Sequence, residues 1–267
     1  MRVPLIELPE AAAKRLSEIE AAKWAAEDAM RSAQGRINSL PRDAHELRAR
    51  LEAQRDAQAD RHRVLSLLVS RCNQWHVELR LPTGSILELA PAPELKLRAS
   101  ETCAAALATV REQIALVQGE LLQVRRAPLR KESRREAVRS YLARLESQVK
   151  PRVGFDARGA AAIQWAEDMA TMNAVLGLLA FVVGSEQVTA AFTRQLEEEP
   201  EAPGALSPLE REKRINELAI RLLELERVEE SLIGRAASEG IELPRRGDAS
   251  PVAVLGVVIA AREVAAA

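Results

Sequence analysis

The densest group of charged side chains that could bind a ligand lies between residues 125 and 152. This segment contains ten Arg or Lys residues and three Glu residues. Cationic side chains along a helix can neutralise nucleic-acid phosphates, and those at a helix N-terminus oppose the macrodipole, so that an external anion is favoured there. The residues expected to contact an anion or a nucleic acid are Arg125, Arg126, Arg130, Lys131, Arg134, Arg135, Arg139 and Arg144.

The alternative for this basic segment is a solvated face that pairs with acidic stretches of the same chain. Residues 197–201 form one such stretch, and Glu224, Glu226, Glu229 and Glu230 form another. The overall formal charge is −1, which argues against a protein dedicated to coating nucleic acid. Both interpretations remain open from the sequence.

Cysteine and histidine side chains could supply a metal site, since thiolate and imidazole are common zinc ligands. Cys72 and His76 are four residues apart, and His62 with Cys103 would complete a set of four. The spacing from His62 to Cys72 is poor, and a strand signal near Trp75 interrupts a shared helical face. Free cysteines are usually small buried hydrophobic residues, so we expect no metal site here.

No motif in the chain predicts an enzyme. Glu167 and Asp168 are adjacent carboxylates, but neighbouring side chains on a helix diverge by about 100°. We therefore expect them to form salt bridges with nearby Arg residues. The sequence contains no dinucleotide fingerprint, no phosphate-binding P-loop and no Gly-x-Ser-x-Gly turn. We expect no catalytic residue, no cofactor and no small-molecule substrate.

The composition predicts an all-α protein built from long helices. Of its 267 residues, 47% are hydrophobic and 29% are charged, while aromatic residues make up 3%. Strands favour aromatic and β-branched residues, which are scarce here. Two cysteines are too few for a disulfide framework, and the first residues lack the pattern of a secretory signal. We expect a cytoplasmic protein in a reducing compartment.

Residues 1–74 are expected to form a helical hairpin or coiled-coil arm. Apolar and small residues recur at alternating spacings of three and four, which is typical of a coiled-coil seam. The seam residues are Leu16, Ile19, Ala26, Met30, Ile37 and Leu40. Pro41 ends the first helix, and Asp43 with Glu46 resembles a capping box for the second. The polar middle of that helix, residues 48–63, is expected to project into solvent.

Residues 75–99 are expected to hold at most one small β-hairpin, at about 75–89, and a connector. Val77, Leu79 and Leu81 alternate with polar residues, and a Pro-Thr-Gly-Ser turn precedes a second apolar run. Alternation with a period of two is typical of a half-buried strand.

Residues 100–198 are expected to form a central helix bundle around the apolar stretch 160–192. Ser100 is a candidate cap for the first helix of this bundle, and Pro128 separates it from the next. A helix that is apolar on all sides is buried in a core or spans a membrane. The run 169–183 is short for a span of roughly 20 residues, so we favour a buried central helix over a membrane-inserted one.

Residues 199–206 read as a linker, and residues 207–267 as a C-terminal helical pair. Ser207 and Glu210 form a capping box around Pro208, and Gly240 is a C-terminal stop. A last apolar helix is expected from Pro251 through Ala261.

These features favour a non-enzymatic helical scaffold or adaptor, which oligomerises or docks partners in a multi-subunit assembly of the bacterial or phage type. One alternative is a nucleic-acid-associated helical protein that uses the basic segment 125–152. Another is a membrane-associated protein that inserts the helix 169–183. We expect protein partners or self-association rather than a membrane.

Overall fold

The computed structural model describes residues 6–41, 43–95, 97, 101–149, 152–155, 161–164, 172–198 and 200–261. Helices dominate, as predicted. The elements are α1 (Glu10–Ser39), α2 (His45–Glu78), β1 (Ser85–Leu89), α3 (Cys103–Arg126), α4 (Lys131–Val149), β2 (Arg152–Phe155), β3 (Ala161–Gln164), α5 (Met172–Val183), α6 (Ser185–Glu198), α7 (Pro208–Ser238), α8 (Pro251–Leu255) and β4 (Val257–Ala261).

The chain divides into two compact units. Unit 1 comprises residues 1–120 and 218–267, and unit 2 comprises residues 121–217. Residues from 218 onward, which we expected to pair with each other as a separate C-terminal part, therefore pack with the N-terminal arm. The long helices α3 and α7 each contribute residues to both units.

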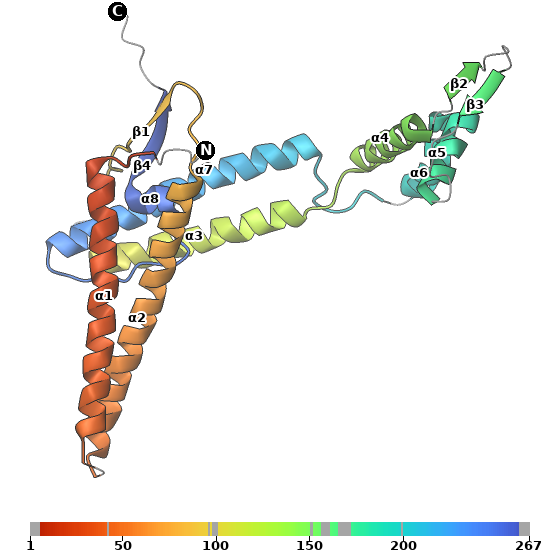
Figure 1. The fold of residues 1–267 in the computed structure, drawn as a ribbon. Helices are drawn as coiled ribbons and strands as arrows, with labels where there is room; N and C mark the ends of the chain where they lie inside the picture. Colours follow the sequence, from red (N-terminus) through yellow and green to blue (C-terminus); the bar gives the residue numbers. More distant parts are fainter. Residues whose placement is uncertain are drawn as a thin grey trace, which may run out of the picture. The chain divides into compact units, whose positions relative to one another are not determined.

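In unit 1, α1 and α2 lie side by side as an antiparallel hairpin (Figure 1). Within the predicted seam, Ile19, Ala26 and Ile37 are buried, while the other members are half-buried. The polar middle of α2 also lies along α1, because Leu51 is buried there and Arg55 donates to Gln34 at 3.0 Å. The predicted hairpin is present.

The core of unit 1 forms where the open end of this hairpin meets α8 and β4. The largest fully buried side chains of this core are Leu68 and Leu255, with Cys72, Val254 and Val257 beside them. A smaller apolar cluster joins α3 to α7 through Ala106, Leu107, Leu232 and Ile233.

The predicted hairpin at 75–89 is replaced by a longer-range pairing. Helix α2 continues to Glu78, so Val77 is helical, and β1 pairs antiparallel with β4, with Ser85 opposite Ala261 and Leu89 opposite Val257. A short alternating run fits a helical turn as well as a strand, which explains the error over residues 75–81.

The last helix is also shorter than predicted. Gly256 adopts a left-handed conformation with φ of 64° and ends α8 after five residues. The β-branched run that begins at Val257 then continues as β4, in keeping with the strand preference of such residues.

Helix termini follow the predicted chemistry in part. At the start of α7, the Ser207 N–H donates to Glu210 at 2.9 Å and the Glu210 N–H donates to the Ser207 hydroxyl at 3.2 Å, which confirms the capping box. At its end, Gly240 is left-handed and the Ile241 N–H donates to the Ala236 carbonyl at 2.8 Å. This is the bond of a Schellman C-cap.

Two other predicted caps differ. Helix α2 begins at His45 without a side-chain cap bond, so the predicted capping box of Asp43 and Glu46 is wrong. Helix α3 is capped by Thr102, whose hydroxyl accepts from the Ala105 N–H at 3.2 Å. Ser100, the predicted cap, lies outside the described residues.

In unit 2, the apolar stretch does not begin as a helix at residue 160, because residues 161–164 form β3, which pairs antiparallel with β2. Gly184, with φ of 103°, separates α5 from α6, which agrees with the break that a glycine at this position predicts. Helix α4 packs against both α5 and α6. Glu167 and Asp168 lie outside the described residues, so their expected salt bridges are not placed.

The predicted burial of this stretch is wrong for much of α5. Ala174 and Ala180 are buried, but four large apolar side chains of the same helix are at least 45% exposed. Along the described part of the chain, no helix alone has the length and apolarity to cross a membrane. The pair Asn173–Val183 and Ser185–Arg194, which is bent by 116° at the break, passes the same test by length and composition.

Candidate functional sites

The most unusual side chains of unit 1 are two buried carboxylates on α7. Glu226 is 4% exposed and Glu229 is 1% exposed. Their spacing of three residues places them on the same helical face. Burying an ionised carboxylate is costly unless it is paired and hydrogen-bonded, so partners are required.

Arg246, from the loop after α7, pairs with both of these carboxylates. Its Nε lies 2.9 Å from Glu229 Oε2, and its Nη2 lies 3.1 Å from Glu226 Oε1. Its Nη1 lies 3.0 Å from Asp248 Oδ1. The other oxygen of Glu229 accepts from Arg111 Nε of α3 at 2.8 Å. One guanidinium therefore joins three carboxylates, and one carboxylate joins α3 to the loop.

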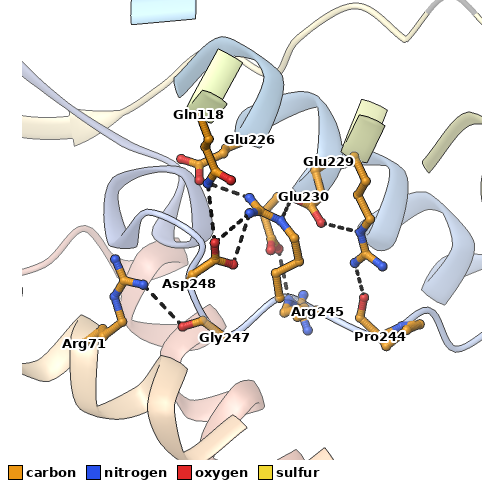
Figure 2. Close-up of polar contacts among 11 residues, drawn as sticks. Arg71, Gln118, Glu226, Glu229, Glu230, Pro244, Arg245, Gly247 and Asp248 are labelled. Atoms are coloured by element: carbon orange, nitrogen blue, oxygen red, sulfur yellow. Dashed lines mark hydrogen bonds and ion pairs between the residues drawn. The ribbon is translucent and has the colours of Figure 1, made fainter. Parts of the chain in front are cut away.

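Further contacts extend this cluster over three helices (Figure 2). Arg245 Nε donates to Glu230 Oε2 at 3.0 Å, and Arg71 of α2 donates to the Gly247 carbonyl at 3.4 Å. Gln118 donates to Asp248 at 3.4 Å. We call Arg111, Glu226, Glu229, Arg246 and Asp248 the carboxylate cluster. With these outer contacts it fastens residues 244–248 to α2, α3 and α7.

Burial sets the ionisation of these groups. Burial raises the pKa of Glu226 above its ordinary value, although the hydrogen bond and charge of Arg246 oppose this. Burial likewise raises the pKa of Glu230, against the opposing charge of Arg245. Burial lowers the pKa of Arg246, but its hydrogen bond with Glu229 and the neighbouring carboxylates outweigh burial and hold that pKa above its usual value.

The buried carboxylates of the cluster are already engaged by guanidinium groups of the same chain. Both oxygens of Glu229 already accept from guanidinium groups, and Glu226 is held by Arg246. From the sequence alone, these glutamates are expected only as partners for the basic segment. A Glu pair at i and i+3, together with two consecutive Arg residues in the loop that follows the helix, was the signal that could have revealed this cluster.

The structure does not bring the candidate metal ligands together. Cys72 is buried in the apolar core, and His76 Nε2 lies 2.6 Å from the Ile6 carbonyl oxygen. His62 Nε2 is 3.9 Å from Glu27, and Cys103 is buried at the start of α3. Among the described residues, no group of three or more His, Cys, Asp or Glu side chains could hold a metal ion.

In the basic segment, the chain supplies its own anion at the N-terminus of α4. The Lys131 N–H donates to a carboxylate oxygen of Glu201 at 3.1 Å, and Arg130 pairs with Glu210 at 2.7 Å. Both contacts fit the self-pairing interpretation.

Farther along this segment, other predicted residues contact near neighbours. Arg139 pairs with Glu136 at 2.6 Å, and the Arg144 guanidinium lies 5.3 Å from the centre of the Tyr141 ring. At the end of α3, Arg125 and Arg126 are exposed. Binding of nucleic acid by this segment stays a prediction.

The remaining candidate is an apolar surface on α5. Val175, Leu179, Val182 and Val183 are 53%, 45%, 70% and 50% exposed, and their spacing places them on one side of the helix. We call these four residues the apolar face. On α6, Phe192 is also 53% exposed.

Compared with protein-family models, curated proteins and solved structures, the chain matches none of them.

Proposed function

We propose that this chain is a non-enzymatic helical scaffold or adaptor, and that it associates through the apolar face of α5, first of all with a second copy of itself. The exposure of this face carries the proposal. Scattered exposed apolar residues are normal on soluble proteins, but a contiguous apolar patch is typical of an interaction site.

The packing of α5 supports this orientation. Small residues face its neighbours in unit 2: Ala174 and Ala180 are buried, and a Cβ at Gly177 would lie 2.6 Å from the Leu145 carbonyl oxygen of α4. The large side chains therefore point away from α4. The Tyr141 hydroxyl, which donates to Asn173 at 2.8 Å, adds a polar contact between the two helices.

Burial of the apolar face would contribute favourable free energy to association. Burying a Val or Leu side chain fully stabilises by about 1.5–3 kcal/mol. Burying the exposed half of four such side chains gives roughly 3–6 kcal/mol per copy, before the cost of lost rigid-body freedom. A two-fold interface would present the same four residues twice.

Light scattering across protein concentration, at low and high salt, tests this proposal. The wild-type chain should form a discrete oligomer that persists at high salt. The double variant Leu179→Glu with Val182→Glu should dissociate to monomers. Leu116→Glu with Ile220→Glu is the matched control, because it places two charges on exposed apolar positions elsewhere, 67% and 62% exposed. A wild-type monomer at every concentration and salt would contradict the proposal.

The membrane alternative rests on one observation, the bent apolar pair of α5 and α6. Flotation of the wild-type chain with anionic vesicles, abolished by the same double variant, would favour that alternative over self-association. The nucleic-acid alternative has a separate test, since binding to duplex DNA through the segment 125–152 should weaken steeply with salt.

A further inference from the structure

Unit 1 contains a cavity that the scaffold proposal does not use. Its volume is about 430 Å³, which falls within the range of small-molecule sites. The walls come from α1, the connector after β1, α7 and the turn that ends α8. Its charged lining residues are Arg15, Glu18, Arg227, Glu230 and Arg245.

Within the described ranges, each of the three arginines donates one hydrogen bond. Arg15 donates to the Leu255 carbonyl at 3.3 Å, and Arg227 donates to the Val257 carbonyl at 3.2 Å. Arg245 donates to Glu230 at 3.0 Å. A guanidinium carries five N–H donors, so most of the donors on these side chains are not used by these bonds. The buried Nε of Arg227 has no hydrogen-bond partner among the described residues.

Gly256 leaves room for the Arg15 guanidinium, and both residues line this cavity. A Cβ built on Gly256 would lie 1.8 Å from Arg15 Nη1, so only glycine allows the guanidinium to lie there. The Gly256 carbonyl also accepts from the Ala90 N–H at 2.8 Å. Gly256 therefore lies next to Arg15 and bonds to Ala90, the first residue of the connector wall.

The charge and shape of the cavity indicate the class of ligand. Three guanidinium groups against two carboxylates leave a net charge of +1 in the lining. The planar guanidinium fork matches the oxygens of phosphate and carboxylate groups. The connector contributes apolar wall, including Pro91, Pro93 and Leu95, which suits a ligand with an apolar body.

We propose that this cavity binds a small organic phosphate, with its phosphate group on Arg15 and Arg227 and its apolar body against the connector. Arg245 is paired with Glu230 and contributes mainly charge. The proposal does not depend on the apolar face of α5, since every lining residue belongs to unit 1.

Isothermal titration calorimetry with phenyl phosphate tests the site in the full chain at constant ionic strength. Inorganic phosphate, benzoate and benzyl alcohol separate the contributions of the phosphate group, the carboxylate alternative and the apolar body. Wild-type protein should bind one phenyl phosphate with a Kd of about 10–1000 μM, and more tightly than any of the other three probes.

Three variants decide whether this binding occurs in the cavity. Arg15→Gln and Gly234→Leu should each weaken phenyl phosphate binding by at least about tenfold. The first removes a guanidinium, and the second fills the cavity at a helical glycine whose Cβ would meet no atom within 4 Å. Arg61→Gln is the matched control, because it removes an arginine that pairs with Glu242 outside this cavity.

Several results would overturn the proposal. These are the absence of saturable binding by wild-type protein, equal binding of benzyl alcohol, tighter binding of benzoate, or unchanged affinity in both cavity variants. The oligomeric state is measured separately and does not depend on these binding results. Failure of the cavity proposal is therefore distinguishable from failure of the scaffold proposal.

Discussion

Replacing Arg246 by Met should be among the most destabilising single changes in unit 1. The guanidinium contacts three carboxylates at 2.9 to 3.1 Å, and two of these belong to residues that are no more than 4% exposed. After substitution Glu229 keeps Arg111, but Glu226 loses its guanidinium partner. The variant therefore leaves a buried carboxylate without its counter-charge.

We expect this change to lower the free energy of unfolding by about 3–5 kcal/mol near neutral pH. Breaking a buried pair by removing one partner costs this much because the remaining charge stays desolvated. Arg61→Met is the matched control. Its ion pair with Glu242 is exposed, so its loss should cost less than about 1 kcal/mol.

The cost should depend on pH in a direction fixed by Glu226. Its pKa is already raised by burial, and removing Arg246 takes away a charge that lowers it. A carboxyl with a raised pKa in the folded state contributes stability that is complete below its unfolded-state pKa and is lost as pH rises through the folded-state pKa. The cost of Arg246→Met should therefore be smaller at about pH 5 than at about pH 8.

Urea unfolding followed by tryptophan fluorescence measures this cost. In a Trp165→Phe background, the emission comes from Trp24 and Trp75, which both belong to unit 1. A cost below about 1 kcal/mol at pH 8 would refute the assignment of the cluster as a stabilising element. An equal cost at both pH values would refute the role given to the Glu226 charge.

Three further predictions concern packing, capping and thiol ionisation. Gly177→Ala should destabilise the protein by about 1–3 kcal/mol in thermal unfolding, because the added Cβ would clash with the backbone of α4. Gly119→Ala is the control and should stabilise the protein by up to about 1 kcal/mol, because its Cβ would have no atom within 4 Å. The backbone and side-chain hydrogen bonds of Ser207 are the largest causes that lower the pKa of Glu210. Ser207→Ala keeps the backbone N–H but removes the hydroxyl, so it should raise the pKa of Glu210 part of the way back in an NMR titration. Burial raises the pKa of Cys72 to about 11 from an ordinary 9.0, so wild-type stability should fall as pH rises through this window, and Cys72→Ala should lack that fall.

The sequence predicted the features of this fold that local periodicity and capping chemistry determine. The spacing of Ile19, Ala26 and Ile37 reveals the seam of α1 because a helix repeats every 3.6 residues. The capping box of Ser207 and Glu210 is likewise read from two residues three apart. Such signals involve neighbours in the chain, and the structure places them as expected.

Features that depend on distant residues could not be predicted in this way. The partner of β1 lies about 170 residues away, and nothing in the alternation of residues 85–89 identifies it. The sequence alone favours the nearer run at 77–81 as the paired strand, whereas β1 pairs with β4. The carboxylate cluster was missed for the same reason. In the sequence, Glu226 and Glu229 have the pattern of solvated charges. Their partners Arg111 and Arg246 belong to other segments, and only the fold brings them into contact.

The apolar face of α5 shows why hydrophobicity in a sequence does not by itself measure burial. Periodicity gives the apolar content of a helix, whereas burial depends on how many neighbours cover it. Helix α5 contacts α4 at Gly177, and its small residues are the buried ones. The two helices approach closely because these side chains are small, but small side chains bury little apolar area. Its larger apolar side chains remain outside. The same sequence that predicts a core helix therefore leaves large apolar side chains exposed, because only one side of that helix is covered.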